Sequence, residues 1–245
     1  MTLRNADPSM NTRKDYRESS LGFLRKLMGA HSEYESHIRN LFLLAAQHMV
    51  SFKPLNMLDV GCGGGERTLR MAQYFRIPPA QTYGLDFNKT YIDQCRTLFH
   101  AEMVDLDIDK IPYEDNTFDL VVCNQLLEHL KNYNKVLQEI IRVTKPGGYM
   151  MIGIPNLAHL INRFYLLFGT QPMCIDVNSS HVRGFTHKSF EHKLNSLSGI
   201  SYIDSAGSEL IYPLPTSVAR PLAKIFKGLC AYVCYLIRKN ETSLV

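Results

Sequence analysis

The chain has 245 residues, of which 45% are hydrophobic and 20% charged, and its formal net charge is +4. This length fits one large α/β domain or two small ones, and the apolar fraction excludes disordered, collagen-like and low-complexity chains. A charge this small also argues against a nucleic-acid binder, which concentrates positive charge on one face. The charge is unevenly spread: residues 56–155 carry ten basic and thirteen acidic side chains, whereas residues 1–55 and 156–245 have balances of +3 and +4.

The cysteines and the apolar runs predict the cellular compartment of the protein. The six cysteines lack paired spacing, so neither a disulfide framework nor a C-x-x-C zinc site is expected. Residues 1–20 contain no apolar run, and the longest uncharged stretch near the end, residues 228–237, has about half of the ~20 residues that span a bilayer. We therefore expect a cytoplasmic, reducing setting.

Residues 1–54 predict a loosely held tail and then two helices, Leu21–Leu27 and Tyr34–Met49, which we expect to form a lid. From Asn56 the pattern changes to short apolar runs that alternate with helical stretches. The expected strands are Asn56–Val60, Gln81–Leu85, Ala101–Val104, Phe118–Cys123 and Tyr149–Ile154, and the expected helices are Glu66–Phe75, Lys89–Phe99 and Tyr133–Val143. This alternation predicts the α/β class, with a doubly wound parallel sheet.

Beyond Pro155 we expect a helix at Leu157–Phe168, an irregular insert, a helix from the N-cap Thr186 to Leu197, and closing strands at Ile200–Asp204 and Glu209–Tyr212. The domain would thus cover residues 55–213, with a core at 55–155 and an insert at 156–186. Residues 214–245 predict an amphipathic C-terminal helix because these apolar positions follow helical spacing: Leu222, Ile225, Phe226, Leu229, Val233, Leu236 and Ile237. Its stripe could face the inner membrane surface as a peripheral contact, a second subunit in a homodimer, or its own domain.

A glycine-rich turn joins the first strand of this core to the next helix. Gly61 and Gly63–Gly65 fall within five residues, where φ > 0 is available, no Cβ blocks a ligand, and amides of a helix N-terminus point outward. A dinucleotide fingerprint would have its third glycine where Glu66 stands, and no Gly-Lys-Ser/Thr of a P-loop follows. The Glu66 carboxylate would repel a pyrophosphate. The predicted ligand is therefore a nucleoside without phosphates that carries a positive group.

Acidic residues follow the next two strands. Asp86 can accept hydrogen bonds from both hydroxyls of a ribose, or it can cap the next helix, although Asn88 is available for that role. Asp105 follows the third strand and could meet an adenine amino group while Leu106 covers the ring. Asp107 is the competing candidate for the amino group.

Five segments, in this order and spacing, resemble class I S-adenosylmethionine-dependent methyltransferases over about residues 55–155: Leu58–Gly65, Gly84–Asp86, Ile111–Val121, Leu127–His129 and Arg142–Gly148. The resemblance implies a Rossmann-like sheet of seven mostly parallel strands with helices on both faces, and S-adenosylmethionine as cofactor. It implies that Gly61 and Gly63 back the methionine part, Asp59 holds its amino group, Asp86 binds the ribose and Asn124 faces the sulfonium. The complete implied cofactor set is Asp59, Gly61, Gly63, Gly65, Asp86, Phe87, Asp105, Leu106 and Asn124.

Methyl transfer is a direct displacement, in which an enzyme mainly aligns the reactants, and a hydroxyl acceptor also needs a base. His129, with Glu128 beside it, is the first candidate for that base. The pair resembles one found near the acceptor in ubiquinone-pathway O-methyltransferases, although the histidine could equally cap or pack. His181, in the insert, is the second candidate.

No metal site is expected, because Gln125 stands where the metal-associated pattern of those O-methyltransferases has a glutamate. His181, His187 and His192 are spaced so that they do not share a helix face. Residues 155–186 resemble bacterial methyltransferases of the ubiquinone, MetW-like and surface-polysaccharide groups, which implies a small-molecule, lipid or glycan acceptor. Nucleic acid is not expected, since no Asn-Pro-Pro-Tyr follows the fourth strand. The alternatives are a non-catalytic cofactor-binding scaffold and a nicotinamide-dependent dehydrogenase, against which Glu66 argues.

Overall fold

The computed structural model describes residues 33–175, 177–210 and 216–241. The chain divides into two units, residues 1–35 and 36–245, and the fold reported below is that of the second. The predicted helix at Leu21–Leu27 and the rest of the predicted tail lie outside the described residues.

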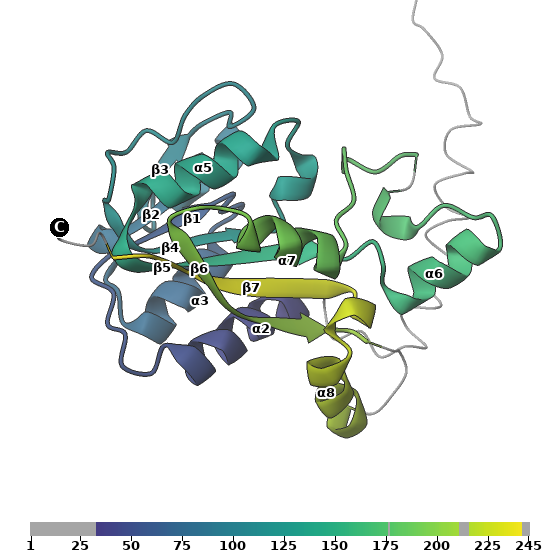
Figure 1. The fold of residues 1–245 in the computed structure, drawn as a ribbon. Coiled ribbons are helices and arrows are strands. Elements are labelled where there is room, and N and C mark those ends of the chain that lie inside the picture. The colour runs from purple at the N-terminus through teal and green to yellow at the C-terminus, as the bar shows by residue number, and fades with distance from the viewer. Residues whose placement is uncertain (1–32, 176, 211–215, 242–245) are drawn as a thin grey trace, which may run out of the picture. The chain divides into compact units, whose positions relative to one another are not determined.

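A seven-stranded sheet with the order β3-β2-β1-β4-β5-β7-β6 forms the centre of the fold (Figure 1). Its first five strands in sequence pair in parallel, and β7 runs antiparallel to both β5 and β6. The strands are β1 Met57–Val60, β2 Thr82–Asp86, β3 His100–Met103, β4 Phe118–Asn124, β5 Thr144–Pro155, β6 Ile200–Ser208 and β7 Tyr232–Lys239. The expected doubly wound, mostly parallel sheet is confirmed. Strand order reverses between β1 and β4, and ligands bind at the carboxyl ends of strands at such a point.

Helices cover both faces of the sheet (Figure 1). They are α2 Glu33–His48, α3 Glu66–Phe75, α4 Lys89–Cys95, α5 Tyr133–Val143, α6 Leu160–Leu167, α7 His187–Asn195 and α8 Thr216–Ile225, with short 3-10 turns η1 Pro79–Gln81, η2 Leu127–His129, η3 Met173–Ile175 and η4 Lys227–Leu229. Thr186 is the N-cap of α7, as predicted, and its hydroxyl accepts the amide of Ser189.

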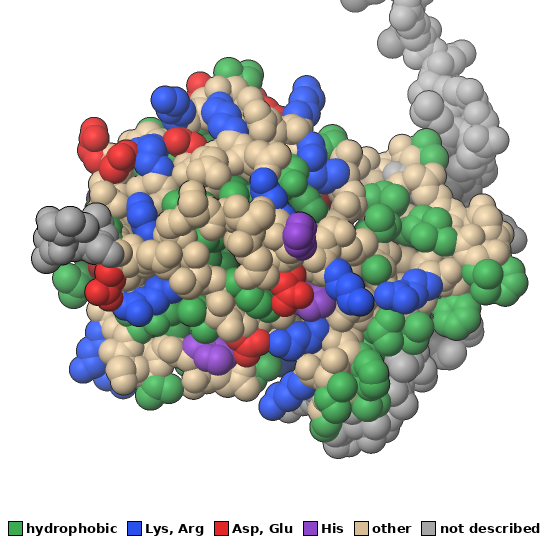
Figure 2. Space-filling model, viewed as in Figure 1, with side chains coloured by type: hydrophobic (Ala, Val, Ile, Leu, Met, Phe, Trp, Pro, Cys, Tyr) green, Lys and Arg blue, Asp and Glu red, His purple; other side chains and the backbone are tan. Residues whose placement is uncertain are grey.

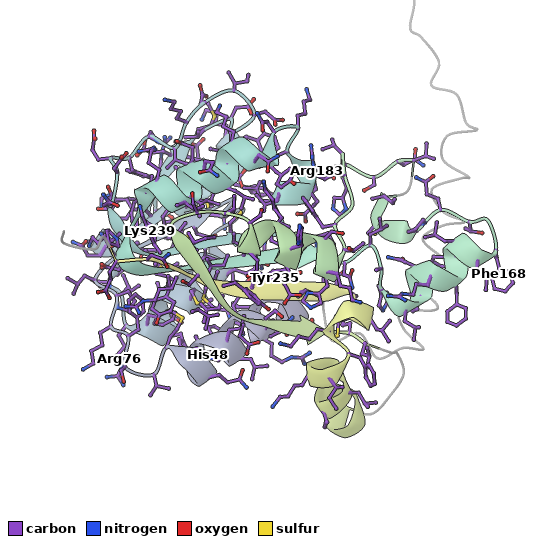
Figure 3. All side chains as sticks on the ribbon, in the orientation of Figure 1. His48, Arg76, Phe168, Arg183, Tyr235 and Lys239 are labelled. Atoms are coloured by element: carbon purple, nitrogen blue, oxygen red, sulfur yellow. The ribbon has the colours of Figure 1, made fainter. Side chains whose placement is uncertain are left out.

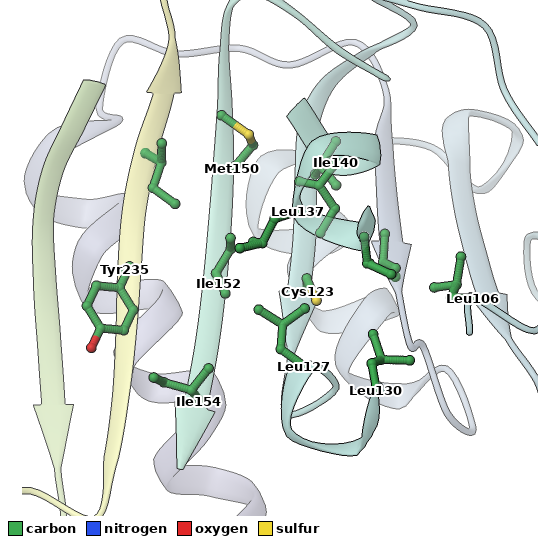
Figure 4. Close-up of a cluster of buried hydrophobic side chains, with 14 of the residues drawn as sticks. Leu106, Cys123, Leu127, Leu130, Leu137, Ile140, Met150, Ile152, Ile154 and Tyr235 are labelled. Carbon is green, nitrogen blue, oxygen red and sulfur yellow. The ribbon is translucent and has the colours of Figure 1, made fainter. Parts of the chain in front are cut away.

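The core lies on both sides of β4, whose consecutive apolar residues alternate between two clusters. Val121 and Cys123 belong to the cluster under α5 and α7, and Figure 4 shows side chains of this cluster, including Leu137 and Tyr235. Leu120 belongs to the cluster under α2 and α3. A strand buried on both faces has no polar alternation, which is why its sequence reads as one apolar run.

Helix α2 confirms the predicted helix at Tyr34–Met49 but not the expected lid. Leu41, Leu44 and Ala45 are buried against the sheet together with Met71 of α3. This part of the predicted lid is therefore a helix of the layer that covers the sheet.

The prediction of one amphipathic helix over residues 214–245 is wrong beyond Ile225. Helix α8 ends there, and Val233, Leu236 and Ile237 lie in β7, buried between β5 and β6. A short apolar run that is buried on both sides satisfies helical spacing as well as strand spacing, so periodicity cannot distinguish the two. The expected strand at Glu209–Tyr212 is also wrong within the described residues, because β6 ends at Ser208 and β7 takes the closing position.

Candidate active site

The glycine turn after β1 is fastened to the end of β2. The amides of Gly61 and Cys62 donate to the carbonyl oxygen of Leu85 at 2.8 and 2.9 Å, and the amide of Gly63 donates to Asp86 Oδ2 at 2.9 Å. Amides at the start of the next helix were expected to point outward, whereas these three amides of the turn are bonded within the chain. At Gly61 and Gly63 the turn therefore offers a ligand a surface without side chains.

The glycines of the turn differ in what surrounds them. Gly63 has φ +52°, and a Cβ placed there would meet no atom within 4 Å. A Cβ on Gly61, at φ +83°, would lie 3.2 Å from Leu126, whereas one on Gly65 would lie 2.8 Å from Cys95 Sγ. Gly65 therefore allows α3 to pack on α4, and nothing in its surroundings supports the predicted cofactor role. Gly63 is the glycine that borders open space.

Asp86 lies at the end of β2 and holds two loops at once. Its Oδ2 accepts from Gly63, and its Oδ1 accepts from the amide of Asn88 at 2.9 Å. Asn88 is the N-cap of α4, accepting the amides of Thr90 and Tyr91, so Asp86 is not needed as the cap. Because each carboxylate oxygen has two lone pairs, Asp86 can still accept hydrogen bonds from a ligand.

Three large apolar side chains are exposed at this edge of the sheet. Phe87 follows Asp86 and is 72% exposed, Met103 is the register partner of Asp86 and is 56% exposed, and Ile108 is 75% exposed. Exposed apolar side chains that gather beside polar groups indicate a binding surface. The expected cofactor set included Phe87 but neither Met103 nor Ile108. The signal for Met103 was available, since an apolar residue ends a strand there.

Of the two candidate aspartates after β3, Asp107 stabilises the local structure. Its Oδ1 accepts the amide of Lys131 at 2.7 Å, which fastens this loop to the residues after η2. Asp105 is exposed, and its side chain accepts the amide of Asp107 at 3.1 Å, within the same loop, which favours Asp105 for ligand binding. Leu106 is 6% exposed and packs in the core, so its predicted role over an adenine ring stays a prediction.

Polar groups are buried at the carboxyl ends of β1 and β4. Asp59 is 5% exposed and accepts the Thr68 hydroxyl at 2.5 Å; burial raises the pKa of Asp59, and Thr68 and Arg67 lower it by less. Asn124 is 5% exposed, and within the part of the chain that the structure describes neither its amide nitrogen nor its amide oxygen has a hydrogen-bond partner. Gln125 follows with φ +58°, a strained conformation that concentrates at functional sites. The orphaned amide of Asn124 is a group that a ligand can satisfy.

The structure brings the three candidate catalytic residues together. One ligand atom each from Glu128, His129 and His181 lies within 4.8 Å of the others, and the two imidazole rings meet edge to face at 4.6 Å. Glu128 is completely buried, and both of its carboxylate oxygens lack a partner among the residues described. Burial raises the pKa of Glu128 to about 8, against the smaller opposing effects of its own backbone and Arg67. Burial also lowers the pKa of His181.

Local contacts explain why residues 52 positions apart in sequence meet. Leu127 and Leu130 anchor the two ends of η2 in the core, which places Glu128 and His129 between them (Figure 4). The insert then returns to this turn: the amide of Val182 donates to the Glu128 carbonyl at 2.9 Å, and Arg183 Nε donates to the Leu130 carbonyl at 3.1 Å. Arg183 also lies over the ring of Tyr133, the first residue of α5, at 4.7 Å (Figure 3).

Comparisons with known proteins agree with this geometry. Residues 58–152 match the family described as a methyltransferase domain. The chain is 34% identical over 128 residues to a demethylmenaquinone methyltransferase of Geobacillus sp. (strain WCH70), and the match covers 46% of this chain and 54% of that protein. It is also 34% identical over 109 residues to norajmaline N-methyltransferase of Rauvolfia serpentina, covering 42% of this chain and 36% of that one. The chain thus spans about half or less of the length of each of these relatives.

A solved structure from Thermotoga maritima, described as an S-adenosylmethionine-dependent methyltransferase and possible histamine N-methyltransferase, has the same fold. Its TM-score is 0.63 at 17% identity, and the match covers 91% of this chain and 97% of that one. Residues 58–152 are thus similar to a methyltransferase domain, and the seven-stranded sheet has the fold of that solved structure. S-adenosylmethionine is the cofactor that this domain implies. The open space at Gly63 and the orphaned amide of Asn124 fit such a group at the carboxyl ends of β1 and β4.

Proposed function

We propose that the protein transfers a methyl group from S-adenosylmethionine to a hydroxyl group of a small-molecule, lipid or glycan acceptor. The observation that carries this proposal is the juxtaposition of two sets of groups at the carboxyl end of β4. The open glycine surface and Asn124 lie on the cofactor side, and η2, which follows directly, supplies the clustered Glu128, His129 and His181.

The cofactor-side residues bind and orient. S-adenosylmethionine, when bound, supplies an electrophilic methyl group on a sulfonium. Asp86 would hold its ribose through the free lone pairs of the carboxylate, Phe87 and Met103 would contact the adenine, and Asp105 its amino group. Asn124 would gain the hydrogen bonds that it lacks. Alignment of this kind supplies much of the rate of a displacement, since a bound, oriented pair is worth about 7–11 kcal/mol of the barrier.

The acceptor-side residues move a proton. His129 Nδ1 lies 3.3 Å from the Ser180 carbonyl oxygen, and His181 Nδ1 lies against that of Cys174. A carbonyl oxygen only accepts, so Nδ1 of each neutral ring carries the proton and Nε2 keeps its lone pair. The lowered pKa of His181 favours the neutral ring at pH 7. Either Nε2 is then suited to take the proton of an acceptor hydroxyl.

An apolar surface on the insert and on α8 supports a lipid or quinone among the acceptors. Phe164, Leu167 and Phe168 are 53%, 75% and 78% exposed, and Ile225 at the end of α8 is 72% exposed. Figure 2 shows hydrophobic side chains gathered over α6 and α8 with Lys and Arg beside them, and Figure 3 shows Phe168 pointing away from the sheet. Such a surface suits peripheral contact with an anionic membrane. No helix among the described residues has the length and hydropathy to cross a membrane.

Calorimetry tests the cofactor side. We expect S-adenosylmethionine and its demethylated product to bind at micromolar concentrations and NADH not to bind. Asp86→Asn should weaken cofactor binding at least tenfold, since a hydrogen bond to a charged group is worth about 1.5–3 kcal/mol. Asp93→Asn, which alters an exposed carboxylate paired with Lys89 on α4, is the matched control. Binding of NADH alone would refute the proposal, and unchanged affinity in Asp86→Asn would refute the ribose assignment.

A methyl-release assay against quinols, phenolic lipids and glycans tests the transfer itself. His129→Ala and His181→Ala should lower kcat with a hydroxyl acceptor while the affinity for the cofactor is unchanged. A chain that binds the cofactor but turns over no acceptor in this panel would support the scaffold alternative. Peripheral membrane contact predicts that the chain sediments with anionic vesicles and that Leu167→Ser with Phe168→Ser releases it.

A further inference from the structure

We propose that Glu128, His129 and His181 form a binding site for a divalent first-row transition metal ion of the Zn²⁺ type. The site lies on the acceptor side of the proposed methyltransferase, so its catalytic role rests on the proposed function, whereas its existence does not. It also departs from the expectation, drawn from Gln125 and from helical spacing, that the chain has no metal site.

The donor set and its spacing carry the first step. One carboxylate oxygen and two imidazole nitrogens lie within 4.8 Å of one another. Zinc bonds to such atoms are about 2.0–2.2 Å long, so ligand atoms around one ion lie about 3–3.5 Å apart. The three side chains therefore need only a small contraction to share an ion.

The orientation of both histidines is the second step. Histidines that ligate metals almost always donate their other ring N–H to a carboxylate, a carbonyl oxygen or water, which fixes the ring and its tautomer. His129 and His181 each place Nδ1 against a backbone carbonyl oxygen, those of Ser180 and Cys174. Both rings thus have their outer partner, and both keep an Nε2 lone pair for an ion.

The third step is the burial of Glu128 without a hydrogen-bond partner among the described residues. Its side chain is completely buried, and neither carboxylate oxygen has such a partner within residues 33–175, 177–210 and 216–241. A buried polar group is normally paired, and an ionised carboxylate removed from water without a cation or donors is costly. An ion held by the two imidazoles would supply that partner.

The chemistry of the donors selects the metal. Mg²⁺ and Ca²⁺ favour oxygen ligands alone, whereas two imidazoles and a carboxylate suit zinc and its first-row neighbours. Three protein ligands leave a position open for water or an acceptor hydroxyl, as in catalytic zinc sites. In the ion-bound protein the Nε2 lone pairs are occupied, so the histidines would act as ligands and not as the base; the ion would instead lower the pKa of an acceptor hydroxyl at its open position, and the proton would pass to solvent water. The ion would also tie the insert to η2.

Zinc binding by the full chain, purified without an affinity tag and stripped with a chelator, tests the proposal. Titration of Zn²⁺ against a chromophoric chelator should give one ion per chain, and Co²⁺ should produce visible absorption bands of low-symmetry coordination. His181→Ala and Glu128→Gln should each lower Zn²⁺ affinity at least tenfold, because outer partners of a ligand alone are worth about 10–100-fold. His192→Ala, which removes an exposed histidine of α7 outside the cluster, should bind as the wild type does.

Thermal melting of each variant confirms that it folds, and Zn²⁺ should raise Tm in the wild type and His192→Ala but not in the other two variants. The proposal is overturned if the wild type binds no Zn²⁺ or if all variants bind it equally. The proposed function is judged separately by calorimetry with S-adenosylmethionine. Cofactor binding without zinc binding refutes the metal site alone, and zinc binding without cofactor binding refutes the methyltransferase alone.

Discussion

Gly63→Ala separates the cofactor role of the glycine turn from its structural role. An added Cβ would meet no atom within 4 Å, so in the free protein the substitution only places alanine at φ +52°. That conformation costs about 1–2 kcal/mol. In a chain of this size, 1 kcal/mol shifts Tm by about 2–4 °C, so we expect Tm to fall by about 2–8 °C. The methyl group occupies the space assigned to the cofactor, so affinity should fall at least tenfold, about 1.4 kcal/mol.

Gly199→Ala is the matched control, because Gly199 has φ +77° and also borders open space, in the turn between α7 and β6. Both variants should melt at similar temperatures, and only Gly63→Ala should lose affinity for S-adenosylmethionine in calorimetry. Wild-type affinity in Gly63→Ala would refute the assignment of this surface to the cofactor. A much larger loss of Tm in Gly63→Ala than in Gly199→Ala would refute the description of its surroundings as open.

Two further predictions concern stability. Arg142 donates to both carboxylate oxygens of Glu139 and lowers its pKa, while burial raises it by less. A carboxyl whose pKa is lower in the folded state stabilises above its unfolded pKa of about 4.3 and ceases to do so as pH falls through the folded pKa. Glu139→Gln should therefore lower the free energy of unfolding by about 1.5–3 kcal/mol at pH 7. In urea titrations, the difference in the free energy of unfolding between this variant and the wild type should shrink below pH 4. A difference that stays constant with pH would contradict the pairing. Glu241→Gln, which alters an exposed ion pair with Arg238, is the control. Leu236→Ala, in buried β7, should cost about 2–5 kcal/mol, whereas Ile225→Ala, 72% exposed, should cost under about 0.5 kcal/mol. Equal, small effects would contradict the placement of β7 in the sheet.

The parallel part of the sheet could be predicted from sequence because its signals are local. The apolar run at Phe118–Cys123 became β4 with one further residue, and Glu66–Phe75 became α3 with the predicted bounds. The glycine turn marked the junction between β1 and α3. Each of these features depends on neighbours in sequence, so composition and spacing were sufficient.

The C-terminal strand could not be predicted in this way, because its conformation depends on partners far away in sequence. Residues 232–237 are apolar at every position, and only pairing with β5 and β6 makes them a strand. The cluster of Glu128, His129 and His181 at η2 also depends on contacts between residues far apart in sequence. His181 meets Glu128 because Val182 and Arg183 bond back to η2, and no spacing rule within one helix or strand describes that contact.

The position of β7 also bears on how the chain is made. The five parallel strands are complete at Pro155, but β6 lies at the edge of the sheet, where among the described strands it pairs with β7 alone, formed by residues 232–239. On a ribosome that adds about 5–20 residues per second, the outer edge of β5 waits roughly 4–16 s for the ~80 residues that follow. During that time the nascent chain presents unpaired strand edges, which are templates for aggregation. A premature stop codon before residue 232 would thus leave two unpaired strands and not a smaller folded protein, so chaperone dependence should be greatest for such truncated chains.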